Sequence, residues 1–323
     1  MFRHSIRTVL VGLCTLAAAS QAVTAAVAAD TPTASDQTAS VAVRPLNPQT
    51  LADLATAMKG EAFAYASYNL FAAQAGREGL SRVAVLFRST ARTELNEHFR
   101  EAAALAGVVG SNEDNLREAI NGESYEHETM YRQFAEQAGT DGDAQAAELF
   151  AELAADEGHH RDAYRTALSV LTSGHGAIPA PPRADTVQVP AGPIQVKSAR
   201  TKANLDTAMH GEALAYAKYM LFAAHARQTG QPALAQLFAG TADVELHEHF
   251  AGEAVLAGLV GITKENLRKA IAGERYEATT LYPGFAAQAM AVGDISAARY
   301  FRDTAADEAR HAAAFQQALD RLR

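Results

Sequence analysis

The feature that most constrains this chain is an internal repeat with an offset of 151 residues. Residues 53–75 match residues 204–226 at 16 of 23 positions, and the same offset joins Glu94 to Glu245. Because the offset stays constant along both copies, no net insertion or deletion has accumulated between them. A repeat of this length predicts the tandem duplication of a complete domain.

Each copy has the pattern of four long helices. The chain is rich in Ala, Leu, Glu and Gln, which favour helix, and breaks containing Gly divide it at regular intervals. In the first copy these breaks predict helices over residues 50–77, 81–107, 113–138 and 143–171. Four such helices joined by short loops form an up-down four-helix bundle.

The sequence therefore predicts an all-α protein of two tandem bundles, residues 50–171 and 201–323. Residues 172–200 hold five of the ten prolines and are expected to form an extended linker. Residues 29–49 are polar and are expected to form a flexible segment. The duplication suggests that the bundles pack as an internal pseudo-dimer, and it leaves open a higher homo-oligomer.

The first 28 residues have the composition of a secretory signal peptide. Arg3 and Arg7 precede the apolar run TVLVGLCTLAAA, and small residues follow it, which predicts cleavage after Ala28 or Ala29. The apolar run is short for a bilayer span. We therefore expect a periplasmic or secreted protein.

Cysteine content and charge exclude several classes of function. Cys14 is the single cysteine and lies inside the predicted signal peptide. The mature chain would then lack disulfides, thiol catalysis and any rubredoxin-type centre. The net charge of −9 makes nucleic acid an unsuitable partner, so none is expected.

Acidic residues occupy the apolar stripe of all four helices in each copy. Glu94 continues the stripe that includes Phe87, and Glu157 and His160 continue the one that includes Leu153. A single glutamate on a helix is usually solvated, but this whole set recurs at a fixed offset. Buried carboxylates without partners repel each other, so a cluster of them requires cations. Many oxygen ligands with few imidazoles favour iron or manganese.

Four motifs recur in both copies. They are Gly-Glu-Ala in the first helix, Phe-x-x-Thr-Ala-x-x-Glu in the second, Gly-Glu-x-Tyr-Glu followed by Tyr in the third, and Glu-x-x-His in the fourth. Together they resemble the rubrerythrin branch of the ferritin-like di-iron proteins, over about residues 50–171 and 201–322. The resemblance implies two ferritin-like bundles, each holding two irons, with manganese as a possible substitute.

Carried over by position, the resemblance implies one ligand set within each copy. The first set is Glu61, Glu94, Glu97, Glu123, Glu126, Glu157 and His160. The second set is Glu212, Glu245, Glu248, Glu274, Glu277, Glu308 and His311. Tyr68, Tyr131, Tyr219 and Tyr282 match family tyrosines beside the metals; they are predicted to contact the bound oxygen species and are equally plausible as core residues.

The second helix leaves a choice between two ligands. The family has Glu-x-x-His there, whereas this chain has ELNEHF at 94–99 and ELHEHF at 245–250. Either Glu97 replaces the family histidine, or the helix shifts so that His98 is used. The i, i+3 spacing of the fourth helix favours Glu97, and likewise Glu248 over His249.

The resemblance implies an oxidoreductase that reduces hydrogen peroxide or oxygen at two dinuclear sites. Without a rubredoxin-type centre it would need an external electron donor, which the sequence does not identify. Two alternatives share the same fold and site: a ferroxidase or iron-handling protein, and a metal-binding bundle without enzymatic activity.

Overall fold

The computed structural model describes residues 45–322. The predicted signal peptide and residues 29–44 of the predicted flexible segment lie outside this range. The described residues form eight long helices and no strands, which confirms the all-α prediction. Among them, no helix combines the length and apolar character needed to span a bilayer.

Four of the eight helices run without interruption, and four contain a short π-helical segment. The uninterrupted helices are α1 (Pro48–Arg77), α6 (Ala144–Ser173), α7 (Ala199–Gln228) and α12 (Ile295–Asp320). The interrupted helices of the first repeat are α2 (Ser81–Thr93), η1 (Glu94–Phe99) and α3 (Arg100–Ala106), then α4 (Asn112–Tyr125), η2 (Glu126–Met130) and α5 (Tyr131–Asp141). Those of the second repeat are α8 (Pro232–Val244), η3 (Glu245–His249) and α9 (Phe250–Ala257), then α10 (Thr263–Tyr276), η4 (Glu277–Leu281) and α11 (Tyr282–Val292).

Local sequence explains where these helices begin and end. Asn47 caps α1, since its side chain accepts a hydrogen bond from the backbone N–H of Gln49, and Pro48 follows at the first helical position. Gly107 and Gly258 end α3 and α9 at φ of 67° and 58°, a left-handed conformation that glycine adopts without strain. The chain therefore turns at equivalent points of the two repeats.

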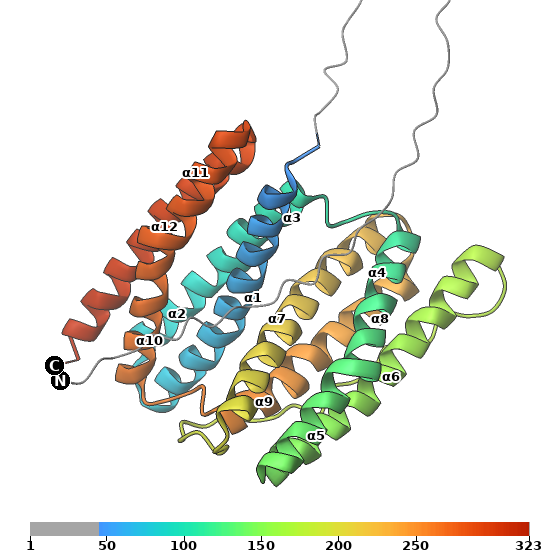
Figure 1. Ribbon diagram of the computed structural model, residues 1–323, viewed down its shortest axis with the longest axis horizontal. Coiled ribbons are helices and arrows are strands. Elements are labelled where there is room, and N and C mark those ends of the chain that lie inside the picture. Colours follow the sequence, from blue (N-terminus) through green and yellow to red (C-terminus); the bar gives the residue numbers. More distant parts are fainter. Residues whose placement is uncertain (1–44, 323) are drawn as a thin grey trace, which may run out of the picture. The chain divides into compact units, whose positions relative to one another are not determined.

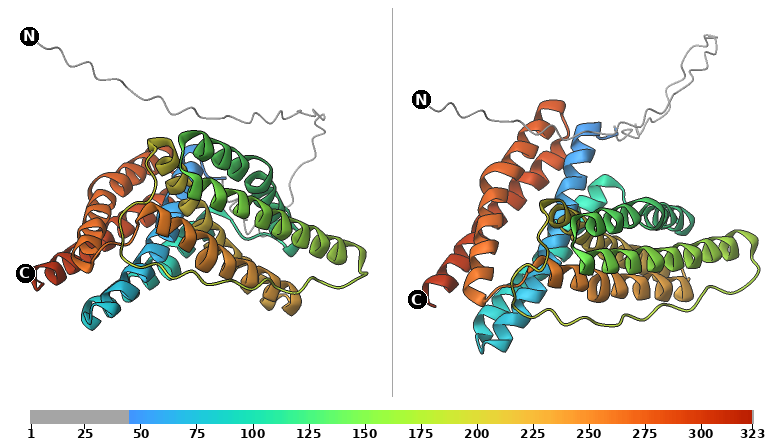
Figure 2. Two further views of the ribbon diagram at one scale, coloured as in Figure 1. Left: turned by 90° about the horizontal axis from the view of Figure 1, so that it is seen from below. Right: turned by 60° about the horizontal axis from the view of Figure 1, so that its bottom comes forward.

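The helices form two four-helix bundles, but the bundles do not coincide with the repeats. Bundle A consists of α1, α2–α3, α10–α11 and α12, and bundle B of α4–α5, α6, α7 and α8–α9. Figures 1 and 2 show the first helices of the chain beside the last ones, with the middle of the chain grouped separately. The predicted bundle boundaries, 50–171 and 201–323, are therefore wrong.

The physical reason for this error is that each helix pair has two equivalent partners. The repeats are so similar that α1–α3 can bury its apolar stripe on α4–α6 or on α10–α12. The connection between α3 and α4 is short and extended, and after it α4 packs against α6 and α7. The result is an exchange of helix pairs between repeats, as in domain swapping.

The two bundles meet through α1 and α7. Tyr65 and Tyr216, which are equivalent residues of the two repeats, stack with ring centroids 5.4 Å apart and an interplanar angle of 7°. Their hydroxyl oxygens lie 3.1 Å apart. Contact between equivalent residues is what a pseudo-two-fold interface requires, so this packing has the character of an internal dimer.

The segment between α6 and α7 is extended, as predicted, and is tied to the second repeat. The backbone N–H groups of Val187, Gly192 and Gln195 donate to backbone carbonyls in η3, the α9–α10 connection and α9 at 2.8–3.0 Å. A Cβ on Gly258 would lie 2.4 Å from the backbone nitrogen of Ile194, so the linker packs closely there. The linker therefore covers one side of bundle B.

Candidate metal centre

Every helix of bundle A contributes at least one acidic side chain to a buried cluster, site A. Glu61 comes from α1, Glu94 and His98 from η1, Glu274 from the end of α10, and Glu308 and His311 from α12. The four carboxylates of this set are 1–2% exposed. The prediction of acidic residues on buried helix faces is correct at these positions.

Site A divides into two groups that share two glutamates. One group is Glu61, Glu94, His98 and Glu308, and the other is Glu94, Glu274, Glu308 and His311. Glu94 places Oε2 2.9 Å from His98 Nδ1 and Oε1 3.1 Å from His311 Nδ1. Glu308 likewise places Oε1 3.0 Å from His98 and Oε2 2.9 Å from His311. Two carboxylates that each face two ligand groups are suited to bridging a pair of metal ions.

Bundle B repeats this arrangement as site B. Its groups are Glu157, Glu212, Glu245 and His249, and Glu123, Glu157, His160 and Glu245. Here Glu157 and Glu245 are shared, and each has one oxygen within 3.2 Å of each histidine Nδ1. Site B therefore matches site A oxygen for oxygen.

The composition of each site corrects the predicted ligand sets. Glu61 and Glu94 were grouped with Glu123, Glu157 and His160, but the exchange of helix pairs places them with residues of the second repeat. Glu212 and Glu245 correspondingly lie with residues of the first. Each site therefore combines the first two helices of one repeat with the last two helices of the other repeat.

The structure also reverses the choice between Glu97 and His98. Glu97 is exposed, whereas His98 is 4% exposed and lies in site A. A π-helical turn closes i→i+5 bonds and is wider than an α-helical turn, so in η1 the residue at i+4 from Glu94 returns to the same face. Single-turn π segments are frequent at functional sites.

The same shift occurs in the second repeat. His249 is fully buried in site B, and Glu248 lies outside it. The Glu248 carboxylate instead accepts a hydrogen bond from the backbone N–H of Asp185 at 2.8 Å, which fixes the linker to η3. Both histidines were visible in the sequence, but only the π-helical backbone distinguishes them from the neighbouring glutamates.

Two further predicted ligands, Glu126 and Glu277, lie at the edge of the sites. Both are half-buried, and they belong to η2 and η4. A Cβ on Gly211 would be 3.7 Å from Glu126 Oε1, and one on Gly60 would be 3.6 Å from Glu277 Oε1. The glycines before Glu212 and Glu61 thus leave room for these carboxylates beside the clusters.

All four predicted tyrosines donate hydrogen bonds to cluster carboxylates. Tyr68 donates to Glu274 and Tyr219 to Glu123, each at 2.6 Å. Tyr282 contacts Glu61, and Tyr131 contacts Glu212. Each site therefore has two buried phenols. Each phenol donates to a carboxylate that belongs to the other repeat.

Two aspartates missed by the sequence analysis face the outer nitrogen of a histidine. His98 Nε2 lies 3.5 Å from Asp307, and His249 Nε2 lies 3.8 Å from Asp156. An outer carboxylate orients a metal-binding imidazole so that its other nitrogen points inward. The recurring pattern Asp-Glu-x-x-His in the fourth helix of both repeats was the available signal.

The electrostatics of the clusters are those of acids held together without enough positive charge. Burial, together with the charge of Glu308, raises the pKa of Glu61 to about 8. Burial and the charge of Glu157 raise the pKa of Glu126 to about 8. Burial raises the pKa of Glu308, but the adjacent imidazoles of His311 and His98 outweigh it and lower the pKa to about 2. Such a set is stable when cations neutralise it.

Comparison with known proteins identifies the family. A model of the rubrerythrin family, described as Rubrerythrin, matches residues 53–168 and 241–319, more than half of the chain. The chain belongs to the rubrerythrin family. Its similarity to a rubrerythrin of Porphyromonas gingivalis is 38% identity over 129 residues, which cover 36% of this chain and 64% of the relative.

Two further relatives show comparable similarity. A rubrerythrin of Nitratidesulfovibrio vulgaris is 34% identical over 128 residues, covering 36% of this chain and 67% of the relative. Nigerythrin of the same organism is 32% identical over 133 residues, covering 37% of this chain and 66% of the relative. The match to the P. gingivalis protein thus spans slightly less than two thirds of its length. No solved structure matches this chain significantly.

The residues present fit the iron that rubrerythrins bind at carboxylate and histidine sites. Several inward-facing atoms are buried without a hydrogen-bond partner, among them Glu94 Oε2, His98 Nδ1 and Glu308 Oε1 in site A. In site B, Glu157 Oε1, Glu245 Oε2 and His249 Nδ1 are in the same condition. Unpaired buried oxygens and imidazole nitrogens are an appropriate donor set for iron. Iron is therefore the cofactor of both sites in this member of the rubrerythrin family.

A cavity of about 290 Å³ adjoins site A. Its lining includes Ser67, Tyr68, His210, Lys269 and the predicted ligand Glu277. It is large enough for a small polar molecule to approach the cluster.

Bundle B differs at the equivalent place. Lys218 and Glu118, the counterparts of Ser67 and Lys269, form an ion pair at 2.6 Å. The surroundings of the two sites are therefore less alike than their ligands.

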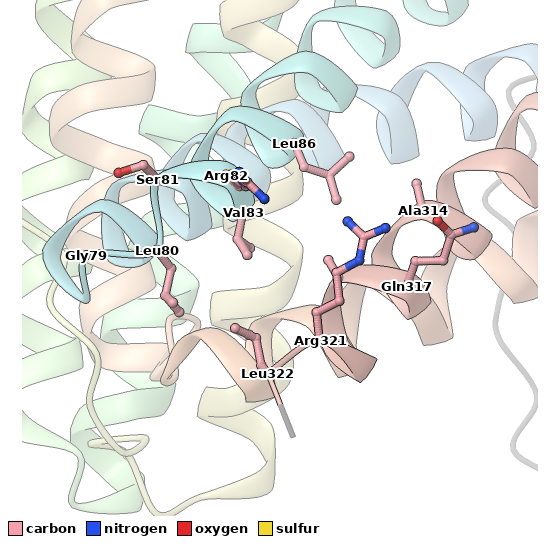
Figure 3. Close-up of a pocket in the computed structure, with 11 residues that line it drawn as sticks. Gly79, Leu80, Ser81, Arg82, Val83, Leu86, Ala314, Gln317, Arg321 and Leu322 are labelled. Atoms are coloured by element: carbon pink, nitrogen blue, oxygen red, sulfur yellow. The ribbon is translucent and has the colours of Figure 1, made fainter.

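A larger cavity has no part in either site. It measures about 610 Å³ and lies between the start of α2 and the end of α12 (Figure 3). Leu80, Val83 and Leu322 provide apolar lining, and Arg82 and Arg321 provide charge. None of its lining residues belongs to the clusters.

Proposed function

We propose that this rubrerythrin-family protein reduces hydrogen peroxide to water at sites A and B, with electrons from an external donor. The observation that carries the proposal is the pair of carboxylates that the two ligand groups share, Glu94 and Glu308 in site A, beside phenols that donate to neighbouring carboxylates. Such a site can accommodate two metal ions and a small oxidant while excluding bulk water.

Two ferrous ions, when bound, supply the two electrons that convert one hydrogen peroxide and two protons into two water molecules. The protein residues keep this chemistry in place. Glu94 and Glu308 span the two ligand groups, and Asp307 orients His98. Tyr68 holds Glu274 through its hydroxyl hydrogen, and Tyr68 also lines the cavity beside site A.

An external reductant is part of the proposal. Cys14 is the single cysteine of the sequence, so residues 15–323 hold no cysteine-ligated iron centre that could relay electrons. The partner is therefore proposed to be a separate reduced protein or small molecule that restores the ferrous pairs after each turnover.

The test is an anaerobic titration with Fe(II), followed by mixing with hydrogen peroxide or oxygen in a stopped-flow instrument. Two dinuclear sites predict about four irons per chain. We expect oxidation by peroxide to be faster than oxidation by oxygen, and repeated turnover when a reductant is added. Faster reaction with oxygen and continued uptake of iron would instead establish a ferroxidase. Binding without oxidation would establish a metal-binding bundle.

We further propose that the protein acts in the periplasm or outside the cell. The support comes from the sequence: two arginines, an apolar run and small residues at the expected cleavage position. Expression with the native N-terminus, followed by fractionation and intact mass measurement, tests this. A mature chain beginning at residue 29 or 30 is expected, and an uncleaved cytoplasmic chain would refute it.

A further inference from the structure

The two sites differ beside one of their tyrosines. In site B, Glu253 of α9 is fully buried, and its Oε1 accepts a hydrogen bond from the Tyr131 hydroxyl at 3.0 Å. The equivalent residue in bundle A, 151 positions earlier, is Ala102, which is also fully buried. Glu253 therefore adds to site B a buried carboxylate that has no counterpart at the equivalent position of site A.

Glu253 belongs to the environment of the cluster. The Tyr131 hydroxyl that it binds also contacts the cluster carboxylate of Glu212. The second carboxylate oxygen of Glu253, Oε2, is buried and has no hydrogen-bond partner among the described residues. Burial, together with the charges of Glu157 and Glu126, raises the pKa of this carboxylate, whereas the charge of His249 favours its ionised form. An unpaired buried carboxylate oxygen next to a ligand cluster costs stability unless a cation is nearby.

Bundle A also differs from bundle B on α12. Tyr300 and Thr304 of α12 are buried, at 1% and 2% exposure. Their counterparts in bundle B are Leu149 and Leu153 of α6. The charge of Glu61 acts on Tyr300, so this phenol lies close to site A. Bundle A thus combines an alanine with two hydroxyl residues, whereas bundle B combines a glutamate with two leucines.

We propose that Glu253 is a sixth carboxylate of site B, which makes this site bind divalent metal more tightly and hold Fe(III) more strongly than site A. The proposal rests on the two dinuclear sites of the proposed function. Glu253 acts through Tyr131 and through its charge, as a positioning residue instead of a ligand.

Charge counting gives the direction of the effect. Site A has five carboxylates, including Glu277. When all five are ionised, their negative charge is one unit larger than the positive charge of two Fe(II) ions and one unit smaller than that of two Fe(III) ions. When bound cations hold Glu253 in its ionised form, the six carboxylates of site B exceed the charge of two Fe(II) ions by two and equal that of two Fe(III) ions. The additional negative charge attracts both oxidation states, but the ferric pair more strongly.

The first experiment is an anaerobic calorimetric titration of the full chain with Mn(II), repeated with Fe(II). We expect two classes of metal pair whose dissociation constants differ on the order of tenfold. Spectroelectrochemical reduction of the iron-loaded protein is expected to show two waves, with site B reduced at the lower potential.

Matched variants assign the difference to Glu253. Glu253→Gln keeps the shape and the acceptor for Tyr131 but removes the charge, and Glu253→Ala introduces the residue that bundle A has. Both are expected to merge the two binding classes and the two reduction waves into one. The reverse change, Ala102→Glu with Tyr300→Leu, is expected to tighten binding at site A.

The outcomes separate this inference from the proposed function. Four equivalent metal ions in the unaltered protein, or two classes that persist in Glu253→Gln, would overturn the role of Glu253 and leave the dinuclear sites intact. Failure to bind metal pairs at all would overturn the proposed function and this inference together. Circular dichroism and thermal melting establish that each variant is folded.

Discussion

Site A and site B use equivalent ligands, but the chain assembles them by different routes. Bundle B is continuous in sequence, from α4 to α9, whereas bundle A combines the first three helical segments with the last three. The Tyr219–Glu123 hydrogen bond of site B joins residues 96 apart, and the Tyr68–Glu274 bond of site A joins residues 206 apart. A duplicated chain can therefore form one bundle from its middle segment and the other from its two end segments, without changing the ligands of either site.

The residues around the ligands also diverge between the sites. Glu253 beside site B replaces Ala102 beside site A, and the Lys218–Glu118 ion pair replaces Ser67 and Lys269. The ligands themselves recur at every position of the four-residue groups. Metal coordination thus constrains the residues that face the ions, while neighbouring residues have been free to give each site its own properties.

The largest effect is expected from cutting the chain in two ways. Residues 108–261 contain the whole of bundle B with its linker, so this fragment should fold as a monomer and bind about two irons. Residues 50–171 contain one repeat but only half of each bundle, so this fragment should dimerise to complete its sites. Light scattering with metal analysis distinguishes them. A monomeric repeat fragment with an intact site would contradict the exchange of helix pairs.

Paired substitutions in the full chain sharpen the same comparison. Glu61→Ala with Glu308→Ala removes two residues of site A, so about two of four irons should remain. Glu61→Ala with Glu157→Ala damages both sites and should leave few bound irons. If each repeat formed its own site, the second pair would be the less harmful, so iron content after anaerobic loading decides between the arrangements.

Single substitutions test the shift within η1. His98→Ala removes the imidazole that the structure places in site A and should weaken iron binding there by about a hundredfold or more. Glu97→Ala changes an exposed residue and should leave both sites intact. The matched pair in η3 is His249→Ala and Glu248→Ala, monitored by the same Fe(II) titration. Loss of iron in Glu97→Ala with retention in His98→Ala would restore the prediction made from spacing.

The tyrosines offer a smaller, site-specific effect. Tyr68→Phe removes a hydroxyl that donates to Glu274, and Tyr219→Phe removes its equivalent at Glu123. Loss of such an outer partner should slow peroxide-driven oxidation at one site by about ten- to a hundredfold. The stopped-flow trace of either variant should therefore become biphasic, with half of the amplitude unchanged. A trace that keeps a single fast phase would show that these phenols only fill space.

The smallest effect concerns the pH dependence of the metal-free protein. The pKa values of Glu61 and Glu126 are near 8 when folded, above the ordinary value of 4.5. The stability that these groups contribute is present in full below about pH 4.5 and is lost as the pH rises to about 8, by at most about 1.4 kcal/mol per pH unit for each group. Thermal melting should therefore fall across this range without metal.

Metal supplies the control for this prediction. Mn(II) neutralises the carboxylates, so the melting temperature of the loaded protein should depend less on pH between 5 and 8. Glu61→Gln should reduce the slope of the metal-free protein, and Glu126→Gln should do the same from the other site. An unchanged slope in both variants would show that other groups control the pH dependence.

The sequence was sufficient for the elements of this fold but not for their pairing. The breaks at glycines placed the helices within a few residues, and the acidic residues on apolar stripes identified Glu61, Glu94, Glu157 and Glu308. The pairing of the helices could not be predicted, because the two repeats have the same apolar stripes. The short extended connection between α3 and α4 determines which of the two possible partners each helix pair packs against. The π-helical turns were equally hidden, because Glu97 and His98 recur together in both copies.

The nested arrangement has a consequence for the order of synthesis. A chain made from its N-terminus has all of bundle B available once residue 257 has emerged, whereas α1 and α2 must wait for α12. Until then the apolar stripe of the first helices has no final partner and is open to wrong associations, including with α4–α6 of another copy. During synthesis, the apolar stripe of the first helices therefore has to be kept from other chains until α12 has been made.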